Sequence, residues 1–214
     1  MIPLFGWTTF DVSGLLPAGW RQDVRTVAAT ADFREFPRTP GLTREAPDVP
    51  SIYRGRVHAA TVRDHLPWLH AAYRTDFLAR AALACGEEVF PASDERYGVV
   101  LNVQRGTRMR FECHIDSNPL TGLLFFTDHH FGGELAVGHD PAAEGIAAVD
   151  QDCSVIPSRA GHLVFFDARR HPHYARPLAV SSDLRIAAVM NFYTVSCPES
   201  TRPQELNAHL YGTR

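Results

Sequence analysis

Long apolar segments are missing from this chain. It contains no run of the roughly 18 to 20 apolar residues that a membrane-spanning helix needs. The first residues, MIPLFGWTTFDVSGLLPAGW, also lack the positively charged start and continuous apolar core of a secretory signal. We therefore expect a cytoplasmic protein with no membrane partner.

Basic charge and cysteine are also scarce. The chain has 21 Lys and Arg against 24 Asp and Glu, so it lacks the basic field that attracts nucleic-acid phosphates. Its four cysteines, at positions 85, 113, 153 and 197, form no CxxC pair. This absence excludes the common zinc knuckles and dithiol redox motifs, and we expect Cys113 to be a small core residue.

The 214 residues, 45% of them hydrophobic, can bury one sizeable core, so we expect a single domain over residues 1–214. Residues 1–57 are rich in Pro and Arg and are predicted to be irregular, with one or two strands, and to serve as a candidate lid. Residues 58–90 are predicted to form supporting helices. Residues 97–195 are predicted to form the β core.

Apolar side chains in residues 59–85 recur at helical spacing, as in Leu69, Tyr73 and Phe77. Pro67 is expected at the start of a second helix, and Gly86 is expected to end it. From Tyr97 onward, short strand-like segments alternate with turns: YGVVLNV, RMRFECHID, LTGLLFF, GELAV, CSVIP, HLVFF and LRIAAVMNFY. This pattern predicts a mainly β jelly roll, or double-stranded β-helix, with the helices packed on one outer face.

The segment RMRFECHID carries the first metal-binding candidates. If it is a strand, Arg110, Glu112 and His114 share one face, and Asp116 follows at the strand end. An imidazole with a carboxylate suits Fe(II) or Mn(II), and a second imidazole completes a facial triad with open coordination positions. We predict His173 as this third ligand, because a strand can resume there, whereas His171 lies in the turn and His162 begins the preceding strand.

The order of these features resembles the Fe(II)/2-oxoglutarate-dependent oxygenases, in particular their prolyl-hydroxylase-like branch. The likeness rests on His114-Ile115-Asp116, on TGLLFF with FGGELAV, on AGHLVFFDARRHPHYARPL, and on Arg185 in LRIAAVMNFY. It implies a double-stranded β-helix with Fe(II) held by His114, Asp116 and His173. It also implies 2-oxoglutarate and O2 as cosubstrates, with Arg185 paired to the distal carboxylate of 2-oxoglutarate.

The resemblance has departures at the positions that often contact the cosubstrate through tyrosine. Gln104 and Phe125 stand at two such positions, and Val189 lacks a hydroxyl that is often found there. Gln104 can still donate a hydrogen bond. Further polar candidates for the cosubstrate are Asn102, Thr121 and Asn191.

Two groups of charged residues are candidates for substrate contact. Arg110 and Glu112 share the predicted face of His114, and the alternative is that they pair with each other or lie at the barrel mouth. In the N-terminal segment the candidates are Arg34, Arg38, Tyr53, Arg54 and Arg56, and the alternative is that these are solvated loop residues.

The resulting functional prediction is a dioxygenase that hydroxylates an unactivated C–H bond of a small molecule or free amino acid, releasing succinate and CO2. The aspartate at the second ligand position favours hydroxylation over halogenation. The alternatives are a peptidyl, prolyl-type hydroxylase and a non-catalytic metal-binding jelly-roll module. A cupin is disfavoured, because cupins more often use three histidines and a glutamate.

Overall fold

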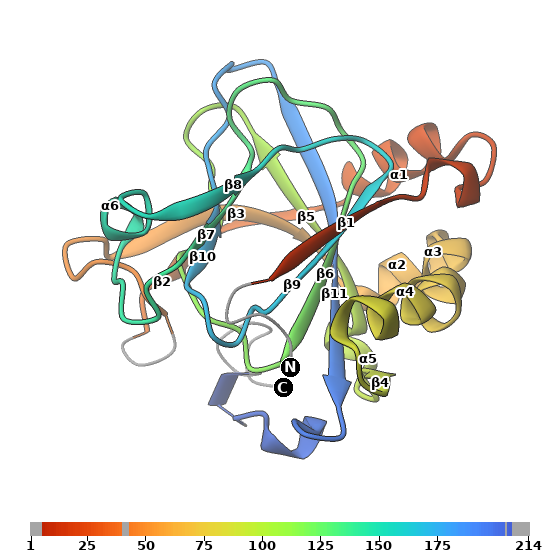
Figure 1. Ribbon diagram of the computed structural model, residues 1–214. Helices are drawn as coiled ribbons and strands as arrows, with labels where there is room; N and C mark the ends of the chain where they lie inside the picture. Colours follow the sequence, from red (N-terminus) through yellow and green to blue (C-terminus); the bar gives the residue numbers. More distant parts are fainter. Residues whose placement is uncertain (1–5, 40–42, 204, 207–214) are drawn as a thin grey trace.

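The computed structural model describes residues 6–39, 43–203 and 205–206, and its strands form two antiparallel sheets (Figure 1). The larger sheet has eight strands. In spatial order these are β1 (Trp7–Asp11), β9 (His162–Phe166), β6 (Leu120–Phe125), β11 (Leu184–Thr194), β5 (Val99–Arg105), β3 (Ser51–Val57) and β2 (Asp32–Pro37), with β4 (Val89–Pro91) paired to β11. The smaller sheet consists of β10 (His173–Ala175), β7 (Leu135–Gly138) and β8 (Cys153–Ile156). The mainly β jelly roll predicted from the sequence is confirmed.

Strand β6 explains why LTGLLFF is apolar without alternation. All six residues of the strand are buried, because both faces of the larger sheet are covered here. Leu123 and Phe125 pack with Leu135 and Val137 of the smaller sheet. Leu124 points the other way, into the core beneath the helices.

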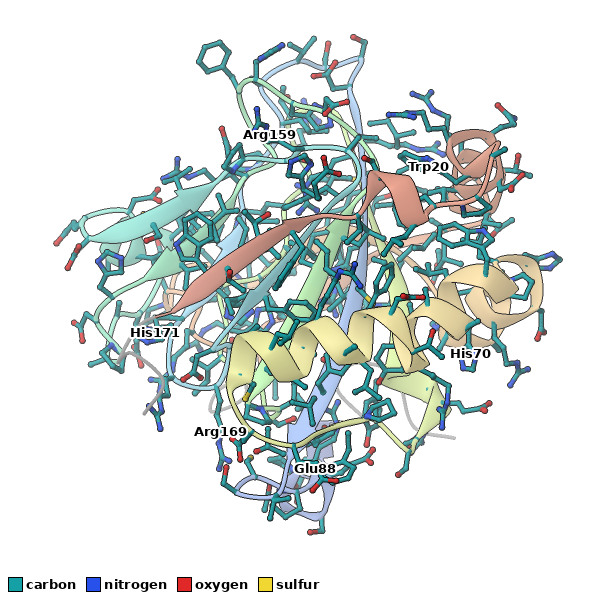
Figure 2. The ribbon with its side chains drawn as sticks, turned by 45° about the vertical axis from the view of Figure 1, so that its right-hand side comes forward. Trp20, His70, Glu88, Arg159, Arg169 and His171 are labelled. Carbon is teal, nitrogen blue, oxygen red and sulfur yellow. The ribbon has the colours of Figure 1, made fainter. Side chains whose placement is uncertain are left out.

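Three consecutive helices cover the outer face of the larger sheet: α2 (Ala59–His65), α3 (Pro67–Arg74) and α4 (Asp76–Cys85). Figure 2 shows α4 lying across the front of the sheet. Pro67 starts α3 as expected, and Gly86, with φ of 72°, ends α4. The break at Thr75 between α3 and α4 was not predicted, and it divides the expected second helix in two.

Tyr73 connects these helices to the central strand. Its hydroxyl donates to the carbonyl of Asn191 and accepts from the amide of Ala92, each at 2.6 Å. Its ring packs on Phe192, with 4.9 Å between ring centroids. The shorter helices are α5 (Glu95–Gly98) and α6 (Ile146–Val149), with 3₁₀ turns at Ser13–Leu15 and Glu199–Thr201.

The N-terminal segment is more regular than predicted. Its described residues, 6–39 and 43–57, form α1 (Trp20–Ala28) and three strands, where irregular structure with one or two strands was expected. β1 pairs with β9, and β3 pairs with β5, so the segment extends both edges of the larger sheet. In α1 the buried residues Trp20, Val24 and Val27 follow helical spacing, a periodic signal that the surrounding charged residues obscured.

The structure also corrects the secondary structure predicted for the segment that precedes His114. RMRFECH was predicted to be a strand, but residues 109–113 form none, and only His114 makes an isolated bridge, to His173. Single backbone hydrogen bonds to two different parts of the chain hold this segment in place. Phe111 donates to the carbonyl of Ala175 at 3.3 Å, and the carbonyl of Cys113 accepts from Arg44 at 2.7 Å.

None of the helices formed by the described residues combines the length and apolar character required to cross a membrane.

Candidate metal centre and its pocket

His114, Asp116 and His173 meet in one cluster, with a ligand atom from each lying within 4.8 Å of the others. Nε2 of His114 is 3.1 Å from Oδ1 of Asp116, and Nε2 of His173 is 3.8 Å from Oδ2. The structure therefore brings together the three residues predicted as metal ligands. All three line one pocket, whose other lining residues come from both sheets.

Backbone hydrogen bonds fix the two histidines relative to each other. The amide of His114 donates to the carbonyl of His173 at 3.1 Å, and the amide of His173 donates to the carbonyl of His114 at 2.9 Å. The amide of Asp116 donates to the carbonyl of Ala168 at 2.8 Å. The ligands thus sit on paired backbone rather than on a free loop, which favours a defined geometry.

The tautomers of both rings follow from their partners. Nδ1 of His114 lies 2.8 Å from the carbonyl of Glu112, and Nδ1 of His173 lies 3.0 Å from the carbonyl of His171. A carbonyl only accepts, so Nδ1 carries the proton in each ring. Nε2 of each ring is then the atom available to a metal, and backbone carbonyls orient the rings as in many metal sites.

The electrostatics favour a cation at the cluster. Burial opposes ionisation of Asp116, but its hydrogen bond with His114 and the nearby imidazoles hold the pKa of its carboxyl well below its usual range. Burial and the neighbouring His114 lower the pKa of His173 to about 4. Burial acts against the charged form of His114 as well, but the hydrogen bond and attraction to Asp116 outweigh it and raise its pKa to about 9. An ionised carboxylate and a neutral imidazole are the forms that bind metal, so a metal ion would replace the proton that Nε2 of His114 directs to Asp116.

Thr121 belongs to the support of Asp116. Its hydroxyl donates to Oδ2 of Asp116 and accepts from Nδ2 of Asn118 at 2.8 Å. Thr121 lines the pocket, as predicted for a cosubstrate contact, but its hydrogen bonds place it as an orienting residue for the metal ligand.

Arg185 lies in β11, lines the same pocket and is only 1% exposed. Its Nε donates to the carbonyl of Gly133 at 2.6 Å, and its guanidinium lies 5.3 Å from the ring centroid of Phe125. Burial lowers its pKa to about 10, with Glu134 acting in the opposite direction. Among the described residues, no carboxylate forms an ion pair with this buried, charged guanidinium, so the site is suited to an anionic ligand.

Gly133 is required for this placement of Arg185. It has φ of +73°, and a Cβ at this position would lie 2.9 Å from Cδ of Arg185. The second glycine of FGGELAV therefore makes room for the arginine, a role that the sequence did not reveal.

The other predicted cosubstrate residues divide into two groups. Asn102 and Asn191 line the pocket, and the side chain of Asn191 donates to the carbonyl of Tyr97. Gln104 is opposite Arg185 in the sheet register but is absent from the pocket lining. Its amide nitrogen donates to the carbonyls of Met109 at 3.2 Å and Arg176 at 2.9 Å, so it bridges backbone segments instead.

Arg110 and Glu112 do not share a role. Glu112 lines the pocket and pairs with the buried Arg54 at 3.3 Å. Arg110 is outside the pocket lining and forms a two-point ion pair with Glu45, at 2.6 and 2.8 Å. The segment carrying Arg110 is not the regular strand that alternation assumed, and the side chain of Arg110 is engaged by Glu45.

Among the N-terminal candidates, Arg54 and Arg56 line the pocket. Arg34 and Tyr53 are exposed, and Nε of Arg38 donates to the carbonyl of Glu45 at 3.1 Å. The two histidines that the sequence analysis set aside in favour of His173 lie elsewhere. Nδ1 of His171 is 2.9 Å from the carbonyl of Gly138, and neither His171 nor His162 belongs to the ligand cluster.

Glu45 is a supporting residue that sequence reasoning missed. It is 1% exposed, and besides binding Arg110 it accepts from the amide of Cys113, next to His114. Its position 65 residues before Arg110 gave no local signal of this contact. Glu45 holds the irregular segment that carries the first metal ligand.

We expect Glu45→Gln to lower the free energy of unfolding by about 3 kcal/mol, because Arg110 loses the carboxylate that balances its charge. We also expect about a tenfold loss of Fe(II) affinity through displacement of His114. Urea unfolding and anaerobic Fe(II) titration measure the two effects. The matched control, Glu35→Gln on exposed β2, should change stability by less than about 0.5 kcal/mol. Equal stability of the two variants would contradict the assigned role.

No protein-family model matches the chain, and no curated protein matches its sequence. Solved structures do match. AviO1 from Streptomyces viridochromogenes Tue57 has 19% identity and a TM-score of 0.61, covering 91% of this chain and 92% of that one. The non-heme alpha ketoglutarate dependent epimerase SnoN from nogalamycin biosynthesis has 17% identity and a TM-score of 0.63, covering 98% and 87%. A prolyl hydroxylase from Trichoplax adhaerens, in complex with a hypoxia inducible factor peptide fragment, has 12% identity and a TM-score of 0.60, covering 92% and 86%. At these identities the likeness is one of fold: this chain has the same β architecture as non-heme alpha ketoglutarate dependent enzymes.

Proposed function

We propose that residues 1–214 act as one Fe(II)/2-oxoglutarate-dependent oxygenase domain that hydroxylates a small molecule. One observation carries the proposal. The cluster of His114, Asp116 and His173 shares a pocket with Arg185, a buried arginine that forms no ion pair with any described carboxylate. A metal-binding triad and an anion-binding guanidinium are the two elements that this cofactor pair requires.

The residues present fit Fe(II). Two imidazoles and one carboxylate form the donor set of the facial triad, which leaves positions open to other ligands. Asp116 is held ionised between the two rings, Nε2 of His173 is unprotonated, and a metal ion would displace the proton from Nε2 of His114. When bound, Fe(II) supplies the redox chemistry that couples O2 and the decarboxylation of 2-oxoglutarate to oxidation of a C–H bond. The overall products are the alcohol, succinate and CO2.

The protein's own contribution is binding, orientation and exclusion of water. Arg185 would hold the distal carboxylate of 2-oxoglutarate, and its bond to Gly133 fixes the direction of the guanidinium. Apolar residues Leu123, Leu135 and Phe166 line the same pocket and limit water access. Thr121 keeps one oxygen of Asp116 hydrogen-bonded and so orients the other.

A small-molecule substrate suits the enclosure of the pocket. Its walls come from β3, β5, β11 and β10, and Arg202 and Leu206 of the C-terminal segment also line it. SnoN has been solved with Fe3+, alpha ketoglutarate and nogalamycin RO, and the Trichoplax adhaerens enzyme has been solved with a peptide fragment. Because several strands and the C-terminal segment surround the pocket, we favour a small molecule over a peptide as the substrate of this chain. All four cysteines are free thiols, which suits a reducing cytoplasm.

The test begins without oxygen. We expect the protein mixed with Fe(II) and 2-oxoglutarate under nitrogen to develop a metal-to-ligand charge-transfer band in the visible spectrum. Admission of O2 together with an oxidisable substrate from the panels named below should then release succinate and CO2 in equal amounts. Folded protein that binds Fe(II) but shows neither the band nor succinate would contradict the proposal and favour a non-catalytic metal-binding module. Small-molecule and peptide panels, compared by succinate release, separate the two substrate classes.

A further inference from the structure

Asn102 is the polar group that β5 contributes to the pocket wall. Its neighbours in sequence, Leu101 and Val103, belong to the core beneath the helices. Because side chains alternate along a strand, Asn102 faces the opposite way, toward the smaller sheet. Ala187, its partner in β11, packs on that side, and Val100, two residues earlier in β5, lines the pocket as well.

The carboxamide oxygen of Asn102 is buried and unsatisfied. Oδ1 has no hydrogen-bond partner among the described residues. The residues directly opposite it do not supply one: the side chain of Ala187 has no donor, and Arg56 of β3 does not donate to this oxygen. A buried acceptor without a partner is costly, because it has lost its contact with water and gained no hydrogen bond in return. A ligand that donates a hydrogen bond to Oδ1 would recover this loss.

The proposed cosubstrate cannot provide this hydrogen bond. At neutral pH, 2-oxoglutarate has two carboxylates and a ketone, which accept hydrogen bonds, and it has no N–H or O–H to donate. Exchanging the oxygen and nitrogen of the Asn102 amide does not change this conclusion, because the amide has one acceptor oxygen in either orientation. The donor must therefore come from the other ligand of the pocket, the substrate.

We propose that the substrate is a small, largely apolar molecule with a hydroxyl or N–H group that donates to Oδ1 of Asn102. Val100, Leu123 and Val189 line the same pocket and suit an apolar body. Asn102 then determines specificity, because a compound that lacks the donor leaves a buried acceptor unpaired. The inference rests on the proposed function and deepens it, since it names the chemistry of the substrate of that pocket.

The first measurement uses wild-type protein loaded with Fe(II) and 2-oxoglutarate under nitrogen. Alcohols and N–H compounds are each paired with a methylated derivative, the smallest pairs being cyclohexanol with methoxycyclohexane and benzamide with N,N-dimethylbenzamide. We expect at least one donor compound to perturb the charge-transfer band at concentrations about tenfold or more below its derivative, because methylation removes the donor. The pair that shows the difference identifies the donor as hydroxyl or N–H. A normal band with equal responses within every pair, or with no response, means that Oδ1 binds water only and overturns the inference alone.

The variant Asn102→Leu tests whether the preference comes from this oxygen, because leucine has a similar size and no acceptor. The preference for the donor compound should disappear, and the affinity for 2-oxoglutarate should remain that of the wild type. A preference that persists would reflect the bulk of the added methyl group and overturn the inference. A large loss of 2-oxoglutarate affinity would make Asn102 a cosubstrate residue and overturn it as well.

The stability of the ligand-free protein gives a second test, which needs neither the band nor a substrate. Asn102→Leu should leave the free energy of unfolding unchanged or increase it, because it removes a buried acceptor that has no partner. Asn118→Leu is the matched control and should lower it, since Nδ2 of Asn118 donates to the carbonyl of Leu120 at 2.9 Å and to the hydroxyl of Thr121 at 2.8 Å. Equal destabilisation by the two substitutions would make Asn102 a structural residue and overturn the inference. If the wild type forms no band at all, the proposed function fails and this inference fails with it.

Discussion

Replacing Asp116 with alanine should lower the affinity for Fe(II) on the order of a hundredfold or more. The carboxylate is the only negatively charged group of the three candidate ligands, and it lies between both imidazoles. Loss of residues that merely orient ligands already costs 10- to 100-fold in affinity at typical metal sites. Anaerobic titration with Fe(II), followed by calorimetry, measures the change directly.

Two further variants make this result specific to the carboxylate. Asp116→Asn keeps the shape and removes the charge, and we expect it to lose most of the same affinity. Asp48→Ala removes an exposed aspartate outside the pocket and should bind Fe(II) as the wild type does. If Asp116→Ala and Asp48→Ala bind Fe(II) equally well, the cluster is not the metal site.

Replacing Arg185 with methionine should weaken 2-oxoglutarate binding about 30-fold or more. Truncating one member of a buried charge pair costs 2–5 kcal/mol, and about 1.4 kcal/mol corresponds to a factor of ten. Methionine fills similar space beside Phe125 and leaves the metal ligands untouched. The charge-transfer band, titrated with 2-oxoglutarate at saturating Fe(II), gives the affinity.

The free energy of unfolding of the ligand-free Arg185→Met variant shows whether the substitution affects folding as well as 2-oxoglutarate binding. Arg185 is a buried charge without a described counter-ion, so removing it should leave the free energy of unfolding unchanged or increase it. The control Arg108→Gln changes an exposed arginine outside the pocket and should retain wild-type binding. An Arg185→Met protein that binds 2-oxoglutarate normally would show that the carboxylate binds elsewhere.

The parts of the site that were predictable have local signals. His114 and Asp116 are two residues apart, and His173 begins a strand after a turn, so residue type and pattern were sufficient to select them. Arg185 stood out because it is a charge within an apolar strand. The buried strand β6 was equally clear from its continuous apolar run.

The parts that were missed depend on contacts distant in sequence. The partner of Arg110 is Glu45, 65 residues away, and the partner of Glu112 is Arg54, 58 residues away. Gln104 was proposed from the resemblance alone; it lies opposite Arg185 on a strand, but the sequence does not specify how far along that strand the pocket extends. Tertiary packing determines how far the pocket extends along the strand, and the residue pattern of a single strand does not contain this information.

The mutual backbone pairing of His114 and His173 has a consequence for the order of events in the cell. Two amide–carbonyl bonds, of 3.1 and 2.9 Å, align the rings through protein contacts alone. In small zinc domains, by contrast, the ion itself drives the chain to fold. We therefore expect folding and metal acquisition to be separable in this protein, so that the polypeptide can fold first and bind iron afterwards.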